Sequence, residues 1–250
     1  MIELIGREER KRLFPLFPNA REALLRSGLE GHMGRAWLSD SEKSALVMMF
    51  GFIFLGGEPD GTLLRQAGKC FPDGFLTFSG AEDWLTEAKN WGAAGEMTRF
   101  DMETPERFDT EMLKRLAVPP KGYRVVPVDD PELFERCLNA PGDLPDVVRN
   151  YPDYASFSAH ALAFVALCHG QVVAGCGTYA HADGQAEVEI DTHPAHRRRG
   201  LALCCGANYL LRCAEKGLRP HWDAMTEISA SLAGKLGFLA PRPYPVVFRE

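Results

Sequence analysis

The order of the elements that the sequence predicts indicates an α/β (α+β) fold with a mixed β-sheet in the C-terminal part of the chain. From Tyr123 onward, hydrophobic patterning predicts the order β-α-β-β-β-α-β-α-β. Strands joined through a helix pair in parallel, whereas the dipeptide His169-Gly170 predicts an antiparallel hairpin. Because both kinds of connection occur, the sheet combines parallel and antiparallel pairs.

A proline pair separates this part from a smaller N-terminal α/β region. Pro119 and Pro120 end a helix predicted over 107–116, because proline cannot continue a helix and restricts the residue before it. We therefore predict two domains, at 1–118 and 119–250. The chain of 250 residues is long enough for both to bury a core.

In the N-terminal domain, the most apolar run extends from Ala45 to Gly57. It is shorter than the roughly 20 residues that a membrane span needs, and it predicts a buried strand that is bent or broken at Gly51. No spacing in this domain is typical of a catalytic motif. The elements predicted here are a helix at 20–27, strands at 35–38 and 46–55, a short strand at 75–78, a helix at 81–91 and a strand at 97–101.

Capping residues define the helices of the C-terminal domain. Asp130 before Pro131 is typical of a helix start, and Gly217 is typical of a helix end. The helix that ends at Gly217 is predicted to begin at Arg199, with its apolar residues on one face. The elements predicted here are strands at 123–128, 162–168, 172–179, 186–192, 219–224 and 244–249, and helices at 130–140, 199–216 and 227–238.

Composition and charge exclude several classes of function. Apolar residues make up 46% of the chain and charged residues 25%, which is typical of a globular protein. The net charge of -6 argues against general affinity for nucleic acid. The seven cysteines form no Cys-x-x-Cys pair, so neither a disulfide framework nor a zinc site is indicated. Because no signal-peptide pattern occurs either, we expect a cytoplasmic protein with buried thiols, no metal and no membrane partner.

Three consecutive arginines, Arg197 to Arg199, stand before Gly200 at the predicted start of a helix. Helix starts carry unpaired N–H groups and a partial positive charge, so cations are unfavourable there. An anion would compensate, because the N–H groups of residues 198–203 would form a cup and Gly200 would let a ligand approach the backbone. The arginines would add charged hydrogen bonds. The sequence therefore predicts either a diphosphate site or a solvated basic run.

Acidic residues alternate along the strand predicted just before these arginines. Glu187, Glu189 and Asp191 share one face of this strand, since side chains alternate between the two faces. Like charges at alternate positions are roughly 7 Å apart and raise the pKa of one another. A carboxylate with a raised pKa can act as a general base near neutral pH. The alternative is a solvent-facing strand without a catalytic role.

The stretch "THPAHRRRGLA" resembles the acyl-CoA-binding signature of the GCN5-related N-acetyltransferases (GNAT), Arg/Gln-x-x-Gly-x-Gly/Ala, on the expected strand, loop and helix. The longer string "EIDTHPAHRRRGLA…GLRPHWDA…S…LAGKLGF" resembles more narrowly the zwittermicin A resistance acetyltransferases. The stretch "GRAWLSDSEKSALVMMFGFIFLGGEP" is similar to the N-terminal region of that subfamily. The resemblance implies a GNAT fold at 119–250. It implies that the domain at 1–118 shapes the acceptor pocket and could be a degenerate copy of the same fold.

The resemblance also implies acetyl-CoA as the co-substrate. Backbone N–H groups from Arg198 to Ala202 would hold its diphosphate, and Arg197 would take the first position of the signature. The strand 188–192 would pair with the pantetheine arm, while Ser229 would lie near the thiol. The tyrosine that relatives often use as a general acid is missing, because Ala233 stands at its position. The residues implied to contact the cofactor are Ile190, Thr192, Arg197, Arg198, Arg199, Gly200, Leu201, Ala202 and Ser229.

The sequence thus predicts an acetyl-CoA-dependent N-acetyltransferase that acetylates a small-molecule amine by direct attack in a ternary complex. Glu189 is the predicted base, with Glu187 as the second candidate, and Ser229 could protonate the leaving thiolate. The alternative is a non-enzymatic acyl-CoA-binding or regulatory module, which the missing tyrosine favours and the acidic strand opposes. A nucleotide-binding protein is a weaker alternative, because no glycine-rich phosphate motif occurs at a strand end. Neither the identity of the amine nor the oligomeric state follows from the sequence.

Overall fold

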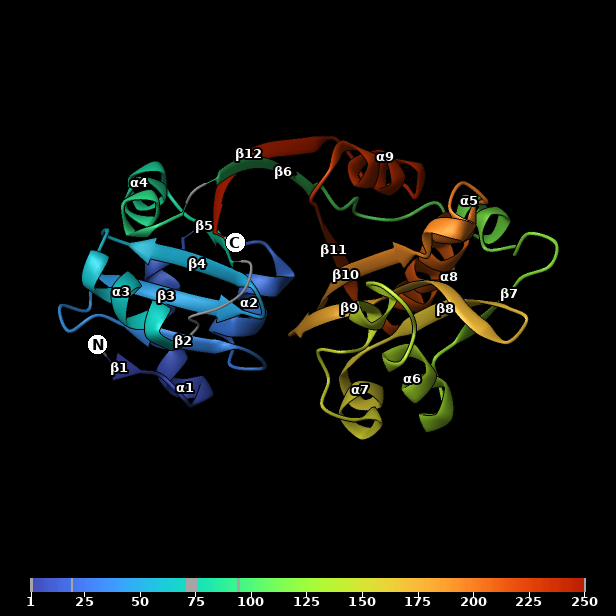
Figure 1. Ribbon diagram of the computed structural model, residues 1–250, viewed down its shortest axis with the longest axis horizontal. Coiled ribbons are helices and arrows are strands. Elements are labelled where there is room, and N and C mark those ends of the chain that lie inside the picture. Colours follow the sequence, from blue (N-terminus) through green and yellow to red (C-terminus); the bar gives the residue numbers. More distant parts are fainter. Residues whose placement is uncertain (1, 19, 71–75, 94, 250) are drawn as a thin grey trace. The chain divides into compact units, whose positions relative to one another are not determined.

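The structure, a computed structural model, describes residues 2–18, 20–70, 76–93 and 95–249. The chain forms two compact units (Figure 1). The first unit comprises Met1–Arg99 and Pro243–Glu250, and the second comprises Phe100–Arg242. The division predicted near residue 119 falls inside the second unit, and the separate roles of 1–118 and 119–250 stay predictions.

The second unit contains the mixed sheet that the sequence predicts. Its strands are β6 (Gly95–Met102, paired with β11 from Phe100 on), β7 (Arg124–Pro127), β8 (Ala163–Cys168), β9 (Gln171–Ala182), β10 (Gln185–Thr192) and β11 (Arg219–Ala224). In the order β6-β11-β10-β9-β8-β7, only β10 and β11 pair in parallel. The predicted hairpin at His169-Gly170 joins β8 to β9, and α8 (Leu201–Lys216) carries the crossover from β10 to β11. The predicted α/β fold with a mixed sheet is therefore confirmed.

The helices of the second unit follow their capping residues. Besides α8, they are α5 (Thr110–Leu116), α6 (Pro131–Leu138), α7 (Tyr154–His160), α9 (Glu227–Lys235) and the 3-10 helices η2 (Leu144–Val147) and η3 (Pro194–His196). As predicted, Asp130 caps α6 by accepting the N–H of Leu133 at 2.8 Å, and the left-handed Gly217 ends α8. Helix α8 begins later than predicted, because Gly200 adopts a left-handed backbone with φ of 80°. The short elements η2 and α7 were not predicted.

Helix α8 covers one face of this sheet and η2 covers the other. Leu201, Cys205 and Leu210 of α8 join Val188 of β10 in one buried core. On the opposite face, a Cβ atom built on Gly177 of β9 would lie 2.3 Å from the carbonyl oxygen of Val147 in η2. Because only glycine permits this approach, η2 lies directly on the strands, and polar side chains of β10 on that face are covered.

In the first unit, the strands follow the order β1-β2-β3-β4-β5-β12, and hydrogen bonds between β12 and β6 continue this order into the strands of the second unit. The elements of the first unit are β1 (Ile2–Glu3), α1 (Arg7–Arg10), the 3-10 helix η1 (Lys11–Leu16), α2 (Ala23–Leu29), β2 (Arg35–Leu38), β3 (Ser44–Met49), β4 (Phe52–Gly57), α3 (Gly61–Cys70), β5 (Leu76–Ser79), α4 (Glu82–Trp91) and β12 (Pro241–Arg249). The strand predicted at 46–55 is broken, since β3 and β4 form an antiparallel hairpin that turns at Phe50 and Gly51. The start of the strand predicted at 75–78 lies outside the described residues.

The two units share one topology. In each, three antiparallel strands lead through a helix into a parallel fourth strand: β2-β3-β4, α3 and β5 in the first, and β8-β9-β10, α8 and β11 in the second. A further strand then pairs antiparallel with the fourth. These last strands are exchanged along the chain, because β6 follows β5 but pairs with β11, and β12 follows β11 but pairs with β5. The same arrangement therefore occurs twice.

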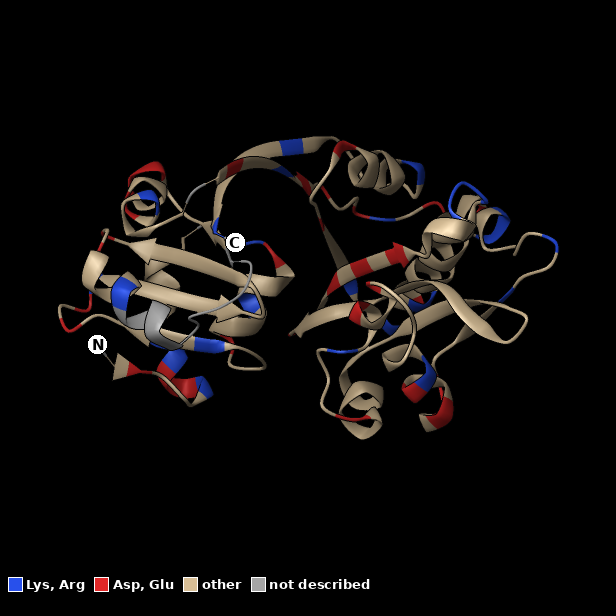
Figure 2. Cartoon of the chain, viewed as in Figure 1, with Lys and Arg blue, Asp and Glu red and all other residues tan. Residues whose placement is uncertain are grey.

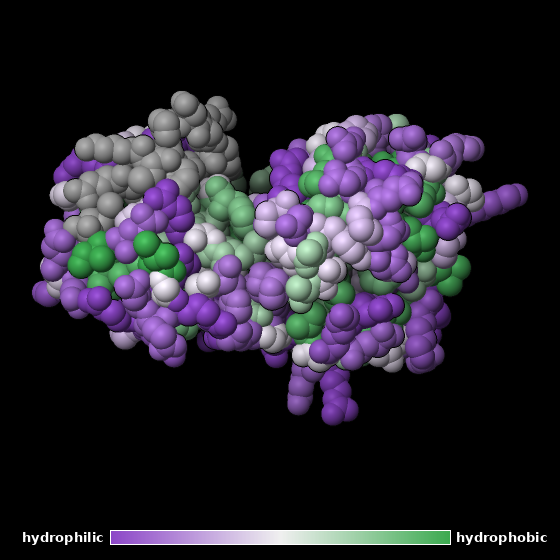
Figure 3. Space-filling model, turned by 90° about the horizontal axis from the view of Figure 1, so that it is seen from below, coloured by the Kyte–Doolittle hydropathy of each residue, from purple (hydrophilic) through white to green (hydrophobic). Residues whose placement is uncertain are grey.

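Hydrophilic side chains cover most of the surface that Figure 3 shows, with smaller hydrophobic patches between them. Within the described part of the chain, no helix combines the length and apolarity that crossing a membrane requires. The described cysteines are all free thiols, and most of them are buried, as predicted; they are Cys137, Cys168, Cys176, Cys204, Cys205 and Cys213.

Candidate functional site

The acidic residues of β10 lie on the face that η2 covers, and Figure 2 shows them as alternating bands along the strand. Glu189 and Asp191 stand opposite Gly177 and Gly175 of β9, the two glycines that make room for η2. Glu187 is buried, whereas Glu189 and Asp191 are partly buried. The sequence places three carboxylates on one face, and the fold buries Glu187 and reduces the solvent exposure of Glu189 and Asp191.

Glu189 combines burial with little compensation for a negative charge. Its Oε1 accepts the backbone N–H of Ile190 at 3.0 Å. Burial raises the pKa of Glu189 to about 8, and the negative charges of Asp146, Asp191 and Glu187 add to this rise. A carboxyl group with this pKa exchanges its proton near neutral pH, which suits a general base.

Glu187, by contrast, is held in a buried ion network. Its Oε2 accepts the Nδ1–H of His221 at 2.8 Å, and the Nε2–H of His221 is donated to Asp101 at 3.1 Å. Arg242 contacts the other oxygen of Asp101 at 2.9 Å. Burial opposes the charge on His221, but Glu187 and Asp101 outweigh it and raise the pKa of His221 well above its ordinary value. His221 is therefore an imidazolium between two carboxylates.

The same glutamate marks the point where β10 and β11 separate. Their parallel ladder extends from Gln185 to Glu187 and ends at the pair of Glu187 with His221. Beyond it, Oε1 of Glu187 accepts the N–H of Asp223 at 3.3 Å. The part of β10 from Val188 to Thr192 thus has no ladder with β11. An unpaired strand edge is suited to bind an extended chain that carries amide groups.

The turn between β10 and α8 is open at the start of the helix. Arg198 and Gly200 both adopt left-handed backbones, with φ of 59° and 80°. Gly200 is the N-cap and no side chain accepts the first N–H groups of α8, which include those of Leu201 and Ala202. A Cβ atom on Gly200 would meet nothing within 4 Å. Space for a ligand therefore lies beside exposed backbone donors.

The three arginines of this turn have different partners. The Nε of Arg197 donates to the carbonyl oxygen of Thr192 at 2.9 Å, and its Nη2 lies 3.8 Å from Asp191. Arg199 donates to the hydroxyl oxygen of Tyr123 at 3.0 Å. Arg198 is exposed and has no partner among the described residues. Because neither the helix start nor Arg198 and Arg199 has an anionic partner among the described residues, the turn fits a diphosphate group.

Ser229 lies in the first turn of α9. Its hydroxyl accepts the indole N–H of Trp222 at 3.1 Å, and its backbone N–H is donated to Thr226, the N-cap of α9. Within the described residues, Ser229 has no hydrogen bond to either glutamate. Ala233 is fully buried, so this part of α9 offers no phenol to the site.

Several residues near the carboxylates were not predicted. Asp146 comes from η2, His221 from β11 and Asp101 from β6, and Asp101 is separated from His221 by 120 positions in the sequence. Tyr179 of β9 also interacts electrostatically with Glu189. Burial raises the pKa of Tyr179 to about 12, and the negative charge of Glu189 is the next largest cause. No local motif marks these residues, because only the pairing of distant strands brings them together.

Other candidates in the sequence have structural roles. Burial raises the pKa of Cys204 to about 11, and its thiol donates to the carbonyl oxygen of Ala117. The helix start therefore does not activate this cysteine, in line with the structural role expected for it. His193 caps η3 by accepting the N–H of Ala195 at 3.3 Å.

Known proteins resemble this chain over most of its length. A family model described as GNAT acetyltransferase matches residues 14–247. The uncharacterized N-acetyltransferase YdfB of Bacillus subtilis (strain 168) is 30% identical over 96 residues, which are 38% of this chain and 37% of that protein. The matched segment thus spans well under half of that curated relative.

Solved structures extend the likeness to the fold. A GCN5-related N-acetyltransferase-like protein from Streptococcus suis 89/1591 is 32% identical, with a TM-score of 0.87 over 98% of this chain and 99% of that chain. A GCN5-related N-acetyltransferase from Kribbella flavida is 17% identical, with a TM-score of 0.57 over 92% and 96% of the two chains, and shows the fold alone. Because the family model spans nearly the whole sequence, this chain belongs to the GNAT acetyltransferase family.

Proposed function

We propose that the second unit binds acetyl-CoA and transfers its acetyl group to the amine of a small molecule. Membership of the GNAT family supports acyl-CoA-dependent acetyl transfer. The observation that carries the finer proposal is the pKa of Glu189, raised to about 8 on a strand whose next turn is an open anion cup. A base and a cofactor cup on one strand–turn–helix segment suit direct transfer between two bound substrates.

In this proposal the cofactor is held by backbone groups of the turn. The N–H groups from Arg198 to Ala202 hold the diphosphate, with Arg197 beside them. The unpaired edge of β10 from Val188 to Thr192 receives the pantetheine arm, with the thioester near Ile190. The end of the β10–β11 ladder at Glu187 supports this placement, because it leaves backbone donors and acceptors available beyond that residue.

Glu189 would act as the general base. It takes a proton from the ammonium form of the acceptor, and the free amine then attacks the thioester carbonyl. A C–N bond forms, the C–S bond breaks, and the electron pair leaves with the thiolate of coenzyme A. The nitrogen loses its second proton in this step, and this proton goes to the thiolate through Ser229 or water. Both oxygens of Glu187 accept hydrogen bonds from β11, so Glu187 is better suited to position the strands than to exchange a proton. Ser229 remains a proposed proton donor to the thiolate.

Acceptor-dependent release of free thiol tests this function. The full chain is incubated with acetyl-CoA and a panel of amines, including amino acids, polyamines and aminated antibiotics. We expect thiol release only with an acceptor, and release without dependence on any amine would contradict direct transfer. Amine-containing antibiotics belong in the panel because the sequence resembles zwittermicin A resistance acetyltransferases, a subfamily to which we propose that the chain belongs.

A non-enzymatic acyl-CoA-binding module is the second candidate. The observation that favours it is the buried Ala233, which leaves α9 without the phenol that many relatives use as an acid. This candidate predicts that acetyl-CoA binds and raises the melting temperature, while no amine in the panel releases thiol. For either candidate we propose a reducing compartment, the cytoplasm, because the sequence contains no disulfide framework.

A further inference from the structure

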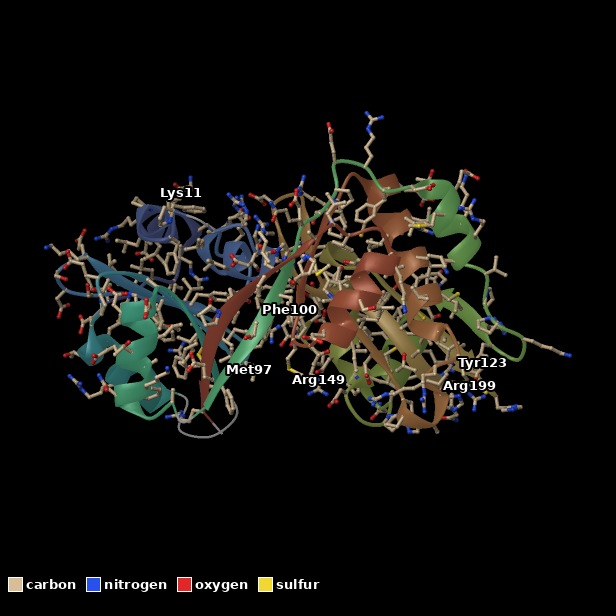
Figure 4. The ribbon with its side chains drawn as sticks, turned by 90° about the horizontal axis from the view of Figure 1, so that it is seen from above. Lys11, Met97, Phe100, Tyr123, Arg149 and Arg199 are labelled. Atoms are coloured by element: carbon tan, nitrogen blue, oxygen red, sulfur yellow. The ribbon has the colours of Figure 1, made fainter. Side chains whose placement is uncertain are left out.

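A hydrogen-bonded cluster of three side chains lies beside the open turn. Tyr123 precedes β7, His196 ends η3, and Arg199 stands immediately before Gly200. Arg199 donates to the hydroxyl oxygen of Tyr123 at 3.0 Å, and that oxygen lies 3.0 Å from Nδ1 of His196. Figure 4 shows Tyr123 and Arg199 next to each other. Segments separated by more than 70 positions therefore meet at one point next to the anion cup.

One of the two hydrogen bonds of this cluster has a fixed direction. The guanidinium of Arg199 can only donate, so the hydroxyl oxygen of Tyr123 accepts from it, and Tyr123 keeps an O–H that Nδ1 of a neutral His196 can accept. Desolvation is the largest cause that lowers the pKa of His196, and the positive charge of Arg199 lowers it further. The lowered pKa favours the neutral ring. In the tautomer whose Nδ1 accepts the O–H of Tyr123, the ring proton is on Nε2, which is then available as a donor.

The cluster also carries positive charge that no carboxylate neutralises. The other contact of Arg199 is the carbonyl oxygen of Ala195, and Arg198 has no partner within the described residues. Arg197 differs, because it is near Asp191. Backbone N–H groups of the turn suffice for a diphosphate, so the arginines and the Nε2–H of His196 leave donors for a second anionic group.

We propose that Tyr123, His196 and Arg199 bind a phosphate monoester, the 3′-phosphate on the ribose of coenzyme A. This inference rests on the proposed function, in which the open turn holds the diphosphate of the same molecule. Arg199 supplies the charge, His196 donates through Nε2, and Tyr123 links the two and fixes the ring of His196. The subsite gives the protein a preference for the phosphorylated coenzyme.

Titration of the full chain with coenzyme A and with 3′-dephospho-coenzyme A tests the inference. Isothermal calorimetry at low salt is expected to show about tenfold weaker binding of the dephospho form, the size of one charge-assisted contact. Equal affinities overturn the subsite and leave the proposed function intact. Absence of binding by both compounds overturns the proposed function and the subsite together.

Two variants assign the preference to the cluster. His196→Asn and Tyr123→Phe are expected to reduce the tenfold preference to about threefold or less, while affinity for the dephospho form changes little. Tyr154→Phe is the matched control, because the ring of Tyr154 packs against Phe134 of α6 and Phe157 of α7 rather than against the cluster. Preference for coenzyme A that survives both cluster variants overturns the assignment to these residues.

Discussion

The turn that follows the third strand differs between the two units, although their topology is the same. In the first unit, Asp60 closes the turn before α3, since its carboxylate accepts the N–H groups of Thr62 and Leu63 at 2.8 and 3.2 Å. In the second unit, Gly200 leaves the corresponding helix start without a side-chain cap. One helix start is satisfied by its own chain and the other is available to an external anion.

The strands before these turns also differ, in the titratable side chains that they carry. Strand β4 has the sequence FIFLGG and carries no titratable side chain, whereas β10 carries Glu187, Glu189 and Asp191. Strand β5 likewise lacks the counterpart of His221 on β11. We therefore propose that the first unit is a copy of the fold that has lost the cofactor cup. Residue chemistry, rather than topology, distinguishes a candidate active unit from a structural one.

The largest expected effect follows from removing the proposed base. Glu189→Gln should lower turnover by about 10²- to 10⁴-fold, the usual contribution of a general base, with affinity for acetyl-CoA unchanged. In the wild type, activity should rise with pH until Glu189 is ionised at pH about 8 and then level off. Thiol release across a pH series measures both effects. Unchanged turnover in the variant would remove Glu189 from this role.

The stability of the same variant gives an independent control. Folded Glu189 keeps its proton up to pH about 8, whereas the unfolded chain loses it near the ordinary value of 4.5. The wild type therefore loses stability as pH rises between these values, since the folded state then binds more protons than the unfolded state. Glu189→Gln should reduce this loss in thermal melts, and a variant that is less stable at pH 8 would point to a structural role.

The next largest expected effect is the loss of stability when the ion network of Glu187, His221 and Asp101 is disrupted. His221→Gln removes the charge shared by Glu187 and Asp101 and should cost about 3 kcal/mol of unfolding free energy, because buried carboxylates lose their partner. The contribution of His221 is complete below its ordinary pKa of 6.5 and is lost as pH rises through the raised pKa of the folded state. Urea titrations at several pH values measure it. His160→Gln, at an exposed histidine, should change stability little.

A side chain at Gly200 should lower the affinity for acetyl-CoA more than it lowers the stability of the fold. Gly200→Ala should weaken acetyl-CoA binding by about tenfold or more, since the methyl group enters the space above the backbone donors and the left-handed backbone costs about 1 kcal/mol. Gly184→Ala is the matched control, because Gly184 is also left-handed with nothing within 4 Å of its Cβ position. Calorimetry should show normal acetyl-CoA affinity for the control. Equal losses in both variants would indicate strain rather than a cup.

The smallest expected effect concerns the closed turn of the first unit. Asp60→Ala should cost about 1 kcal/mol of stability, as for other helix caps, and Asp130→Ala in the second unit should cost a similar amount. Both variants should bind one acetyl-CoA per chain, the stoichiometry that we also expect for the wild type. Calorimetry of the wild type gives the contrary outcome. If the chain binds a second equivalent of acetyl-CoA, the first unit has kept a cofactor site, which contradicts the proposed loss.

Local patterns predicted the parts of this protein that depend on neighbours in the sequence. The caps at Asp130 and Gly217 are confirmed because short-range sterics and hydrogen bonds determine them. The mixed sheet of the second unit is confirmed because helix and hairpin connections determine which strands pair in parallel and which pair antiparallel. The start of α8 was placed at Arg199 rather than Leu201, because only the backbone conformation of Gly200 shows where the helix begins. The glycine and arginine pattern of the turn was also visible in the sequence.

The sequence by itself determined the order of elements, the acidic strand and the turn with its arginines. Only the tertiary structure decided that Glu187 is tied to His221 while Glu189 keeps an oxygen free of such partners. It also decided that η2 brings Asp146 towards Glu189. The physical reason is that a pKa depends on burial and on charges from strands far apart in the chain, and these become neighbours only through the register of the folded sheet.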